Sequence, residues 1–446
     1  MLGDKEAKRI IDEALGHAKE ATQAEVMLNT EESALTRFAN SYIHQNVAES
    51  NTRISVRIVL GKKIGVAGSN DLSSEGLRKA VENAMTIAKF QQENPDFVSL
   101  PSPAPYENVN SYRQETANAS PELRADAVAV VCNKAKDAGL VASGAFEIAS
   151  GEIAIGNSLG VFAYAPYSNA AISTVIMGDD SSGWADYASS NVTDINAEAL
   201  ADEAVGKALR SHNPQRMEPG DYDVILEEYA VADMIEFLNF IGISALAVQE
   251  GRSFMKLGEK ITGDNISITD NALDPAGFPF PFDFEGYPRK ELAIIENGIA
   301  RNVPYDSYTA NREGKPEKNT GHALPAPNTY GPIAINLFVA PGDSSKEEML
   351  KRVQRGVWVT RFHYVNVSRP LPPTITGMTR DGTFMIENGE ITRPLRNFRF
   401  TQDILAALAN AELISRTTKL QKGFFGGTMT PAMLIRGFHF SGVTEF

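Results

Sequence analysis

Two segments of the 446-residue chain repeat each other at an offset of 117 to 118 residues. The copies share Asn-Ser, Ser-Asn and Ile-Ser dipeptides and two glycines in the same order. A repeat at a fixed spacing indicates that one supersecondary unit occurs twice. The matching positions are Asn40-Ser41 with Asn157-Ser158, Ser50-Asn51 with Ser168-Asn169, Ile54-Ser55 with Ile172-Ser173, Gly61 with Gly178, and Gly65 with Gly183.

Each copy is predicted to begin with a helix, to continue with strands and to end with a second helix. Residues 4–20 carry apolar side chains at helical spacing, and residues 54–58 alternate as in a half-buried strand. A serine cap at Ser73 opens a helix to about Phe90, and Ser120-Pro121 opens the helix of the second copy. We therefore expect residues 1–212 to form one domain of two repeated helix–antiparallel sheet–helix units.

The second half of the chain follows a linker at residues 211–221 and has a different sequence pattern, dominated by turn and strand signals. It carries Asn-Gly at 297–298 and again at 388–389, and this dipeptide favours a type I′ hairpin turn because both residues tolerate positive φ. Further strand-like runs and one helix near residues 402–414 complete the pattern. The sequence predicts an α+β fold in which residues 220–446 form a mostly antiparallel β domain.

Charge and cysteine content narrow the function classes. A net charge of −14 argues against nucleic acid and anionic membranes as direct partners, because most of such a surface repels them. The single cysteine, Cys132, excludes a disulfide within the chain and a cluster of thiolate metal ligands. The N-terminal residues lack a secretory apolar run, and the longest apolar runs are too short to span a bilayer. We expect a cytoplasmic location.

Four stretches together resemble one family. They are "TRFANSYIHQN", "GVAGSNDLSSEGLRKAVENAMTIAKF", "IENGIARNVPYDSYTAN…TGHA" and "GTFMIENGEITRPLRNFRFTQDIL". Their order and spacing resemble the TldD/PmbA family, whose members are labelled modulators of DNA gyrase, and the resemblance covers nearly the whole chain. It implies one of two subunit types. TldD-type chains are zinc metalloproteases with H-E-x-x-x-H on a helix and a C-terminal cysteine, whereas PmbA/TldE-type chains lack those ligands and pair with the catalytic subunit.

The stretch "VILEEYAVADMIEFL", residues 224–238, stands where the resemblance implies the metal helix. A match that begins at Glu227 leaves alanine at the second ligand position. A match that begins at Glu228 leaves tyrosine in place of the base and Asp233 as the second ligand. Neither register supplies two nitrogen ligands and a base, and "KGFFGGTMTPAM" has no cysteine. We interpret Glu227, Glu228 and Asp233 as a degenerate motif on a solvated helix face. The alternative is a weak hard-cation site.

Two other groups of residues are candidate contacts for a peptide or a partner. The first is Arg37, Asn40 and His44, on a strand that could line a cleft or a subunit interface. The second is Asn319 and His322, in a polar loop of the kind that often carries function. The aromatic segment at residues 278–291, "FPFPFDFEGYPRKE", is either an anchored loop or part of a surface near substrate or partner.

The resemblance and the missing ligands lead to one preferred function and two alternatives. The chain is expected to be a non-catalytic regulatory or structural subunit, without a cofactor of its own, of a zinc metalloprotease that cleaves unfolded peptides or peptide precursors. Its partner is then a TldD-like chain that holds the zinc, or a second copy in a homodimer. The alternatives are a stand-alone peptidase that uses Glu228, Asp233 and His322, and a binding protein that modulates DNA gyrase.

Overall fold

The sequence repeat forms a six-stranded antiparallel sheet, with strand order β3-β2-β1-β4-β5-β6. The computed structural model describes residues 1–444. The two copies meet at the centre of the sheet, where β1 pairs with β4. The first copy consists of α1 (Asp4–His17), β1 (Gln23–Ala39), β2 (Tyr42–Leu60), β3 (Lys63–Ser69) and α2 (Ser74–Phe90), and the second of α4 (Pro121–Asp137), β4 (Val141–Asn157), β5 (Phe162–Met177), β6 (Ser182–Ser189) and α5 (Ala197–Arg210).

The repeated glycines allow a helix to pack directly on the outer strand of each copy. A Cβ atom at Gly65 would lie 2.2 Å from the Ala84 carbonyl oxygen of α2. At Gly183 it would lie 2.1 Å from the Ala204 carbonyl oxygen of α5. Both separations are too short for real atoms, so any larger residue would push the helix off the sheet. The close contact explains why a glycine occurs at the same place in both copies.

The C-terminal half forms a second, 11-stranded sheet, which is mixed. Two of its pairings, β11 with β17 and β12 with β7, are parallel, and the others among the described residues are antiparallel. The strands are β7 (Gly220–Leu226), β8 (Ile268–Asp270), β9 (Leu292–Glu296), β10 (Ile299–Ala300), β11 (Asn336–Val339), β12 (Arg355–Arg369), β13 (Thr374–Glu387), β14 (Glu390–Pro394), β15 (Phe398–Asp403), β16 (Ala411–Lys422) and β17 (Gly427–Val443).

Short helices connect these strands. The two predicted Asn-Gly turns are confirmed, since Asn297, Gly298, Asn388 and Gly389 all have positive φ. The helix predicted near residues 402–414 is shorter, because the chain from Ala411 onward pairs with β17. The helices are α6 (Glu228–Gly242), α7 (Ala245–Gln249), α8 (Ser307–Arg312), α9 (Lys346–Lys351) and α10 (Ile404–Ala409), with α3 (Gln114–Ala117) in the N-terminal half.

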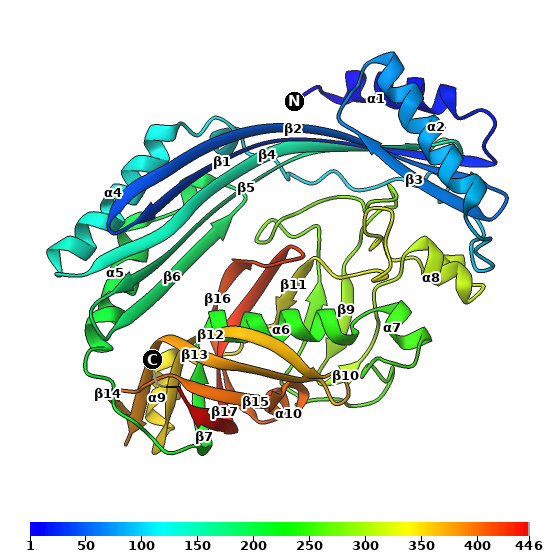
Figure 1. Cartoon of the computed structure of the whole chain (residues 1–446). Helices are drawn as coiled ribbons and strands as arrows, with labels where there is room; N and C mark the ends of the chain where they lie inside the picture. Colours follow the sequence, from blue (N-terminus) through cyan, green and yellow to red (C-terminus); the bar gives the residue numbers. More distant parts are fainter. Residues whose placement is uncertain (445–446) are drawn as a thin grey trace.

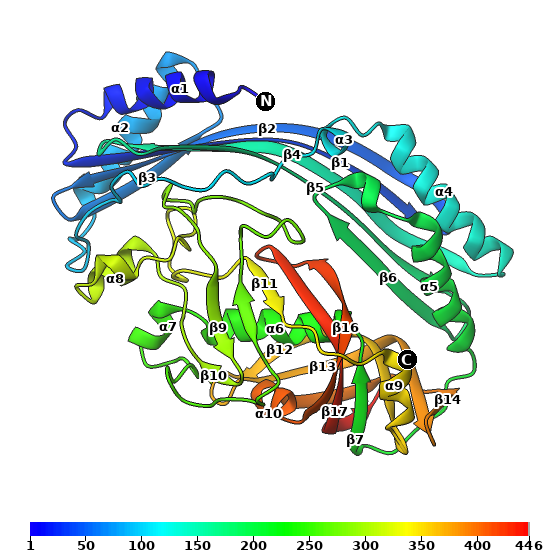
Figure 2. The ribbon, with the colours of Figure 1, turned by 180° about the vertical axis from the view of Figure 1, so that it is seen from behind.

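The six-stranded sheet arches over the C-terminal half (Figure 1). Its four long helices, α1, α2, α4 and α5, cover the outer, convex face, and the concave face is turned toward the second sheet (Figure 2). Among the described residues, no strand of one sheet pairs with a strand of the other. The proposed domain division between residues 212 and 220 stays a prediction. Within this part of the chain, no helix is long and apolar enough to cross a membrane.

The aromatic segment at 278–291 attaches the C-terminal half to one end of the arch. Phe282 is fully buried and packs with Ile153 and Ile155 on the concave face of β4. Beside it, Arg57 of β2 donates to Glu25 at 2.5 Å and to Glu285 at 3.0 Å. These buried contacts identify the segment as an anchored loop at this end of the sheet.

Candidate functional site

The candidate site is centred on α6, which follows β7 directly, as the sequence predicts. The helix packs against β12 and β17 and lies between the two sheets (Figure 1). Glu227 and Glu228 at its start are only 3% and 1% exposed. The prediction of a solvated helix face is therefore wrong for these two residues. They are covered by side chains from distant parts of the sequence, which helical periodicity cannot reveal.

Lysines neutralise the carboxylates at the start of α6. Lys207 of α5 donates to Glu227 at 2.7 Å, and Lys346 of α9 donates to Glu228 at 2.7 Å. The second oxygen of Glu227 accepts the indole N–H of Trp358 at 2.6 Å. Burial opposes the ionisation of Glu227, but the Lys207 and Lys346 ammonium groups outweigh it and hold the pKa of Glu227 below its usual value. Both buried glutamates are thus held in ion pairs with lysines.

The ion pairs extend into a network that joins the two halves of the molecule. Lys207 also donates to Glu203, four residues earlier on α5, at 2.7 Å. Lys419 of β16 donates to Glu203 at 2.7 Å and to the hydroxyl of Tyr229 at 2.8 Å. Although burial acts against it, the two ammonium groups lower the pKa of Glu203 to about 2. Three carboxylates and three lysines therefore balance each other at the start of α6.

This arrangement does not fit a zinc ion. Zinc sites use imidazole, thiolate or carboxylate ligands with free lone pairs, and catalytic sites keep an open position for water. Here the carboxylates of Glu227 and Glu228 already bind ammonium groups, and none of the chain's six histidines lies on α6. Within residues 1–444, no group of three or more His, Cys, Asp or Glu side chains could hold a metal ion.

Further along α6, Asp233 and Glu236 are carboxylates without a matching lysine. Burial raises the pKa of Asp233 to about 8, and the neighbouring charges of Glu236 and Asp186 add to the rise. Burial also raises the pKa of Glu236. Asp186 lies opposite on β6, and its pKa rises to about 7, chiefly through burial and despite nearby cations. A group of acids with raised pKa values therefore lies where α6 meets the arched sheet.

The two segments that the family resemblance links to zinc do meet in space. The hydroxyl of Thr428 donates to Glu236 at 3.4 Å, and a Cβ atom at Gly423 would overlap the Glu236 carboxylate. The β16–β17 hairpin that carries these residues also presents Phe424, which is 88% exposed. Helix α6 and the "GFFGG" hairpin thus form one site, although neither supplies a nitrogen or sulfur ligand.

The predicted contact residues form two separate groups. Arg37, Asn40 and His44 are exposed around the β1–β2 turn, at one end of the arch. The loop that carries Asn319 and His322 lies under the opposite end, because Ala323 donates to Asp283 in the anchored segment. That segment contacts the sheet beside Glu25, and Arg37 lies twelve residues further along β1, or about 40 Å in an extended strand.

Asn319 and His322 are buried rather than displayed on a polar loop. Their side chains are 3% and 1% exposed. The imidazole of His322 pairs with Asp270 of β8 and lies 2.9 Å from the Thr320 hydroxyl, while Asn319 accepts the backbone N–H of Gly321. These internal contacts give both residues a role in holding the loop. Their predicted contact with a peptide or partner stays a prediction.

Two adjoining cavities form a groove on the concave face of the arched sheet. The first, of about 460 Å³, is lined mainly from β1, β2 and β4, and the second, of about 270 Å³, from β4, β5 and β6. Both include Glu147 of β4 and Lys422 of β16, which form an ion pair at 2.7 Å. Asp186 lines the second cavity. The groove therefore reaches the acids beside α6.

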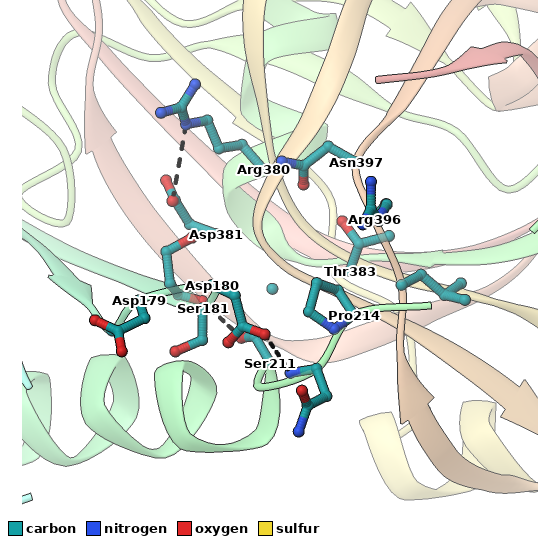
Figure 3. A pocket seen from close by; sticks show the side chains of 15 residues that line it. Asp179, Asp180, Ser181, Ser211, Pro214, Arg380, Asp381, Thr383, Arg396 and Asn397 are labelled. Carbon is teal, nitrogen blue, oxygen red and sulfur yellow. Dashed lines mark hydrogen bonds and ion pairs between the residues drawn. The ribbon is translucent and has the colours of Figure 1, made fainter. Parts of the chain in front are cut away.

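A separate cavity of about 610 Å³ lies where the linker passes between the two halves. Figure 3 shows the lining of this cavity, to which the β5–β6 turn contributes Asp179 and Asp180, and β13 contributes Arg380 and Asp381. Asp180 is paired with His212 at 2.6 Å, and Asp381 with Arg361 at 2.5 Å. Because Asp180 and Asp381 are paired internally and lie away from α6, we place the candidate site at α6 and the adjoining groove rather than at this cavity.

Several residues of the site escape prediction from sequence. Lys207 stands four residues after Glu203, a spacing that indicates only a local helical pair. Lys346, Lys419 and Asp186 carry no motif at all. Their importance comes from tertiary contacts with α6, which lie outside any short-range pattern.

The fold and site define a two-sheet protein in which ion-paired carboxylates stand at the predicted metal position. The family model described as PmbA/TldA metallopeptidase C-terminal domain matches residues 219–442, and the model of PmbA/TldA metallopeptidase domain 1 matches residues 24–88. The first match alone spans half of the sequence. The chain therefore belongs to the PmbA/TldD metallopeptidase family.

Similar proteins match over different lengths. The chain is 26% identical to Metalloprotease PmbA of Escherichia coli O157:H7, over 96% of this chain and 97% of that protein. It is 29% identical to Metalloprotease MJ0996 of Methanocaldococcus jannaschii, where the match covers 51% of this chain and spans only 50% of the relative's length. The crystal structure of TldE from Thermococcus kodakarensis has the same fold, with a TM-score of 0.89, 21% identity, and coverage of 98% and 99% of the two chains.

Proposed function

We propose that the chain is a non-catalytic, regulatory or structural subunit of a cytoplasmic zinc metalloprotease that cleaves unfolded peptides or peptide precursors. A TldD-like partner chain holds the zinc and the catalytic residues, and this chain completes the chamber around the peptide. The observation that carries the proposal is the pairing of Glu227 and Glu228 with Lys207 and Lys346 at the position of the metal helix. Ammonium groups stand there in place of a metal cation.

The likeness to known proteins supports the same assignment. The fold matches a structure named TldE over nearly the full length of both chains. The full-length relative in Escherichia coli is named a metalloprotease, which supports a link to proteolysis. A stand-alone peptidase built on Glu228, Asp233 and His322 receives less support. Glu228 is bound to Lys346, and His322 is buried against Asp270 beneath the far end of the arch.

The decisive experiment compares the chain alone with the chain co-expressed with a TldD-like partner. Zinc is measured by elemental analysis, and cleavage by an assay on casein or an unfolded peptide. We expect zinc and cleavage only in the co-purified complex, and neither when the metal-helix histidines of the partner are replaced. About one zinc per chain with cleavage by the isolated protein would overturn the proposal, and Glu228 and Asp233 would then be the first residues to replace.

A further inference from the structure

The groove beneath the arched sheet has the dimensions of a short extended peptide. It crosses the strands from Gln45 on β2 to Asp186 on β6. Four steps between neighbouring strands separate these positions, a distance of about 20 Å at 4.8 Å per step. An extended chain of about six residues covers that length. The two cavities together, of about 460 and 270 Å³, are large enough for several side chains.

The walls of the groove are strongly acidic. Four carboxylate side chains line its two cavities, against a single lysine, Lys422. That lysine is already paired with one of the four at 2.7 Å. Such an excess of negative charge in a partly enclosed space attracts a cation and repels an anion. The four carboxylates are Glu31, Glu49, Glu147 and Asp186.

Asp186 is a lining residue whose charge is not fully satisfied within the described chain. Its Oδ1 atom is buried and has no hydrogen-bond partner within the described chain. The cations that act on it are each engaged elsewhere, so they do not cancel its charge fully. Lys419 binds Glu203, Lys207 binds Glu203 and Glu227, and Arg361 binds Asp381. An additional cation placed in the neighbouring cavity would supply the interaction that this carboxyl group lacks.

The outer edge of β6 is not free to accept a peptide as an added strand. Lys207 donates to the carbonyl oxygen of Trp184 at 3.2 Å. The hydroxyl of Tyr229 contacts the backbone N–H and the carbonyl oxygen of Asp186, at 3.4 and 3.5 Å. These side chains already bind the backbone groups with which a new strand would pair. Recognition in this groove must therefore depend on side chains.

From these observations we propose that the groove binds a basic segment of an extended peptide, with Asp186 and Glu147 pairing with its lysine or arginine side chains. The inference rests on the proposed function in taking a peptide as the ligand, and it adds the class of peptide. Lys422 shows where a ligand cation can bind, because its own ammonium group already binds Glu147 in the groove. A basic side chain can replace it there without leaving a carboxylate unpaired.

The test measures binding of fluorescent unfolded ten-residue peptides that differ only in two central residues, which are lysine, glutamine or glutamate. Fluorescence anisotropy is recorded with the isolated full chain and with its complex with the TldD-like partner. We expect the lysine peptide to bind about tenfold more tightly than the glutamine peptide, and the glutamate peptide to bind weakest. Asp186→Asn should remove most of this preference, measured as the ratio of the affinities for the lysine and glutamine peptides.

Two further variants keep the result interpretable. Glu147→Gln should reduce the preference even if Asp186→Asn folds poorly, and Asp137→Asn, exposed at the end of α4 on the outer face, should leave it intact. Equal affinities for the three peptides would overturn the inference. If zinc and cleavage still appeared in the complex, the proposed function would remain valid without this inference. A lysine preference in a chain that forms no active complex would instead support the groove as a peptide-binding site and overturn the metalloprotease role.

Discussion

The carboxylates at the start of α6 and those in its middle differ in how their charge is compensated. At the start of the helix, Glu227 and Glu228 are ion-paired with lysines, and the pKa of Glu227 is lowered. In the middle, burial raises the pKa values of Asp233 and Glu236, and no lysine compensates. The same residue type on one helix therefore serves two purposes. The first pair holds elements together, and Asp233 of the second pair lies near Asp186, which lines the groove.

The difference follows from what lies opposite each turn. The start of α6 contacts α5, α9 and β16, each of which contributes a lysine. The middle faces β6, which contributes Asp186, and the "GFFGG" hairpin, which contributes the exposed ring of Phe424. A buried carboxylate costs free energy unless a cation or hydrogen bonds offset it. In the middle of α6 protonation avoids that cost, which is the cause of the raised pKa values of Asp233 and Glu236.

The largest expected effect comes from removing the lysine at the centre of the network. Lys207→Met leaves Glu227 and Glu203 without their shared ammonium group, at a site where the lysine side chain is 5% exposed. We expect the free energy of unfolding to fall by about 3 kcal/mol, because an uncompensated charge remains buried. Denaturant unfolding followed by tryptophan fluorescence measures it, since Trp358 donates to Glu227.

The matched control is Lys79→Met, which breaks another lysine–glutamate pair four residues apart on a helix. Both side chains of that pair are more than 60% exposed. Exposed pairs of this kind contribute little, so the control should unfold nearly as the original protein does. A loss of stability equal in both variants would show that the buried network has no special role.

The next effect concerns the carboxylates in the middle of α6 and depends on pH. Asp233 has an ordinary pKa of 3.8 and a folded-state pKa of about 8, so the folded chain keeps a proton that the unfolded chain releases between those values. The contribution of Asp233 to the free energy of unfolding therefore falls as pH rises from about 4 to 8. Asp233→Asn cannot ionise, and its stability relative to the original should rise from near zero at the acid end by up to about 1.4 kcal/mol for each pH unit toward the alkaline end.

Unfolding free energies at several pH values test this prediction. Asp137→Asn, on the exposed end of α4, serves as the control and should show no such trend. A constant difference between Asp233→Asn and the original across the range would mean that Asp233 is ionised in the folded protein. The contrast between the start and the middle of α6 would then be lost.

How much of this could be read from the sequence depends on the range of the signal. The serine caps of α2 and α4 and the two Asn-Gly turns are local features, and the repeat is a direct match between two segments; the structure confirms all of them. The burial of Glu228 was missed because its partner, Lys346, stands 118 residues away. His322 does lie in a loop, as predicted, but its burial escapes the sequence, since its partner Asp270 is 52 residues away. Helical periodicity describes one face of α6 but not the surface that covers it.

A smaller effect is expected from the second ion pair of the first turn. Lys346 is 25% exposed, whereas its partner Glu228 is 1% exposed. Lys346→Met should lower the free energy of unfolding by about 1 kcal/mol, because water can reach the side from which the ammonium group is removed. Denaturant unfolding of this variant beside Lys207→Met ranks the two pairs. A larger loss for Lys346→Met would move the centre of the network from α5 to α9.

The smallest effect is expected from metal ions. Because lysines occupy the carboxylates at the start of α6, adding zinc or a chelator should shift the melting temperature of the isolated chain by less than about 1 °C. A titration with calcium examines the Glu228–Asp233 alternative in the same way, with Glu228→Gln as the matched variant. Stoichiometric binding of either ion, with a rise in melting temperature that Glu228→Gln abolishes, would show that a metal can displace Lys346. The start of α6 would then be a masked metal site rather than a fixed ion pair.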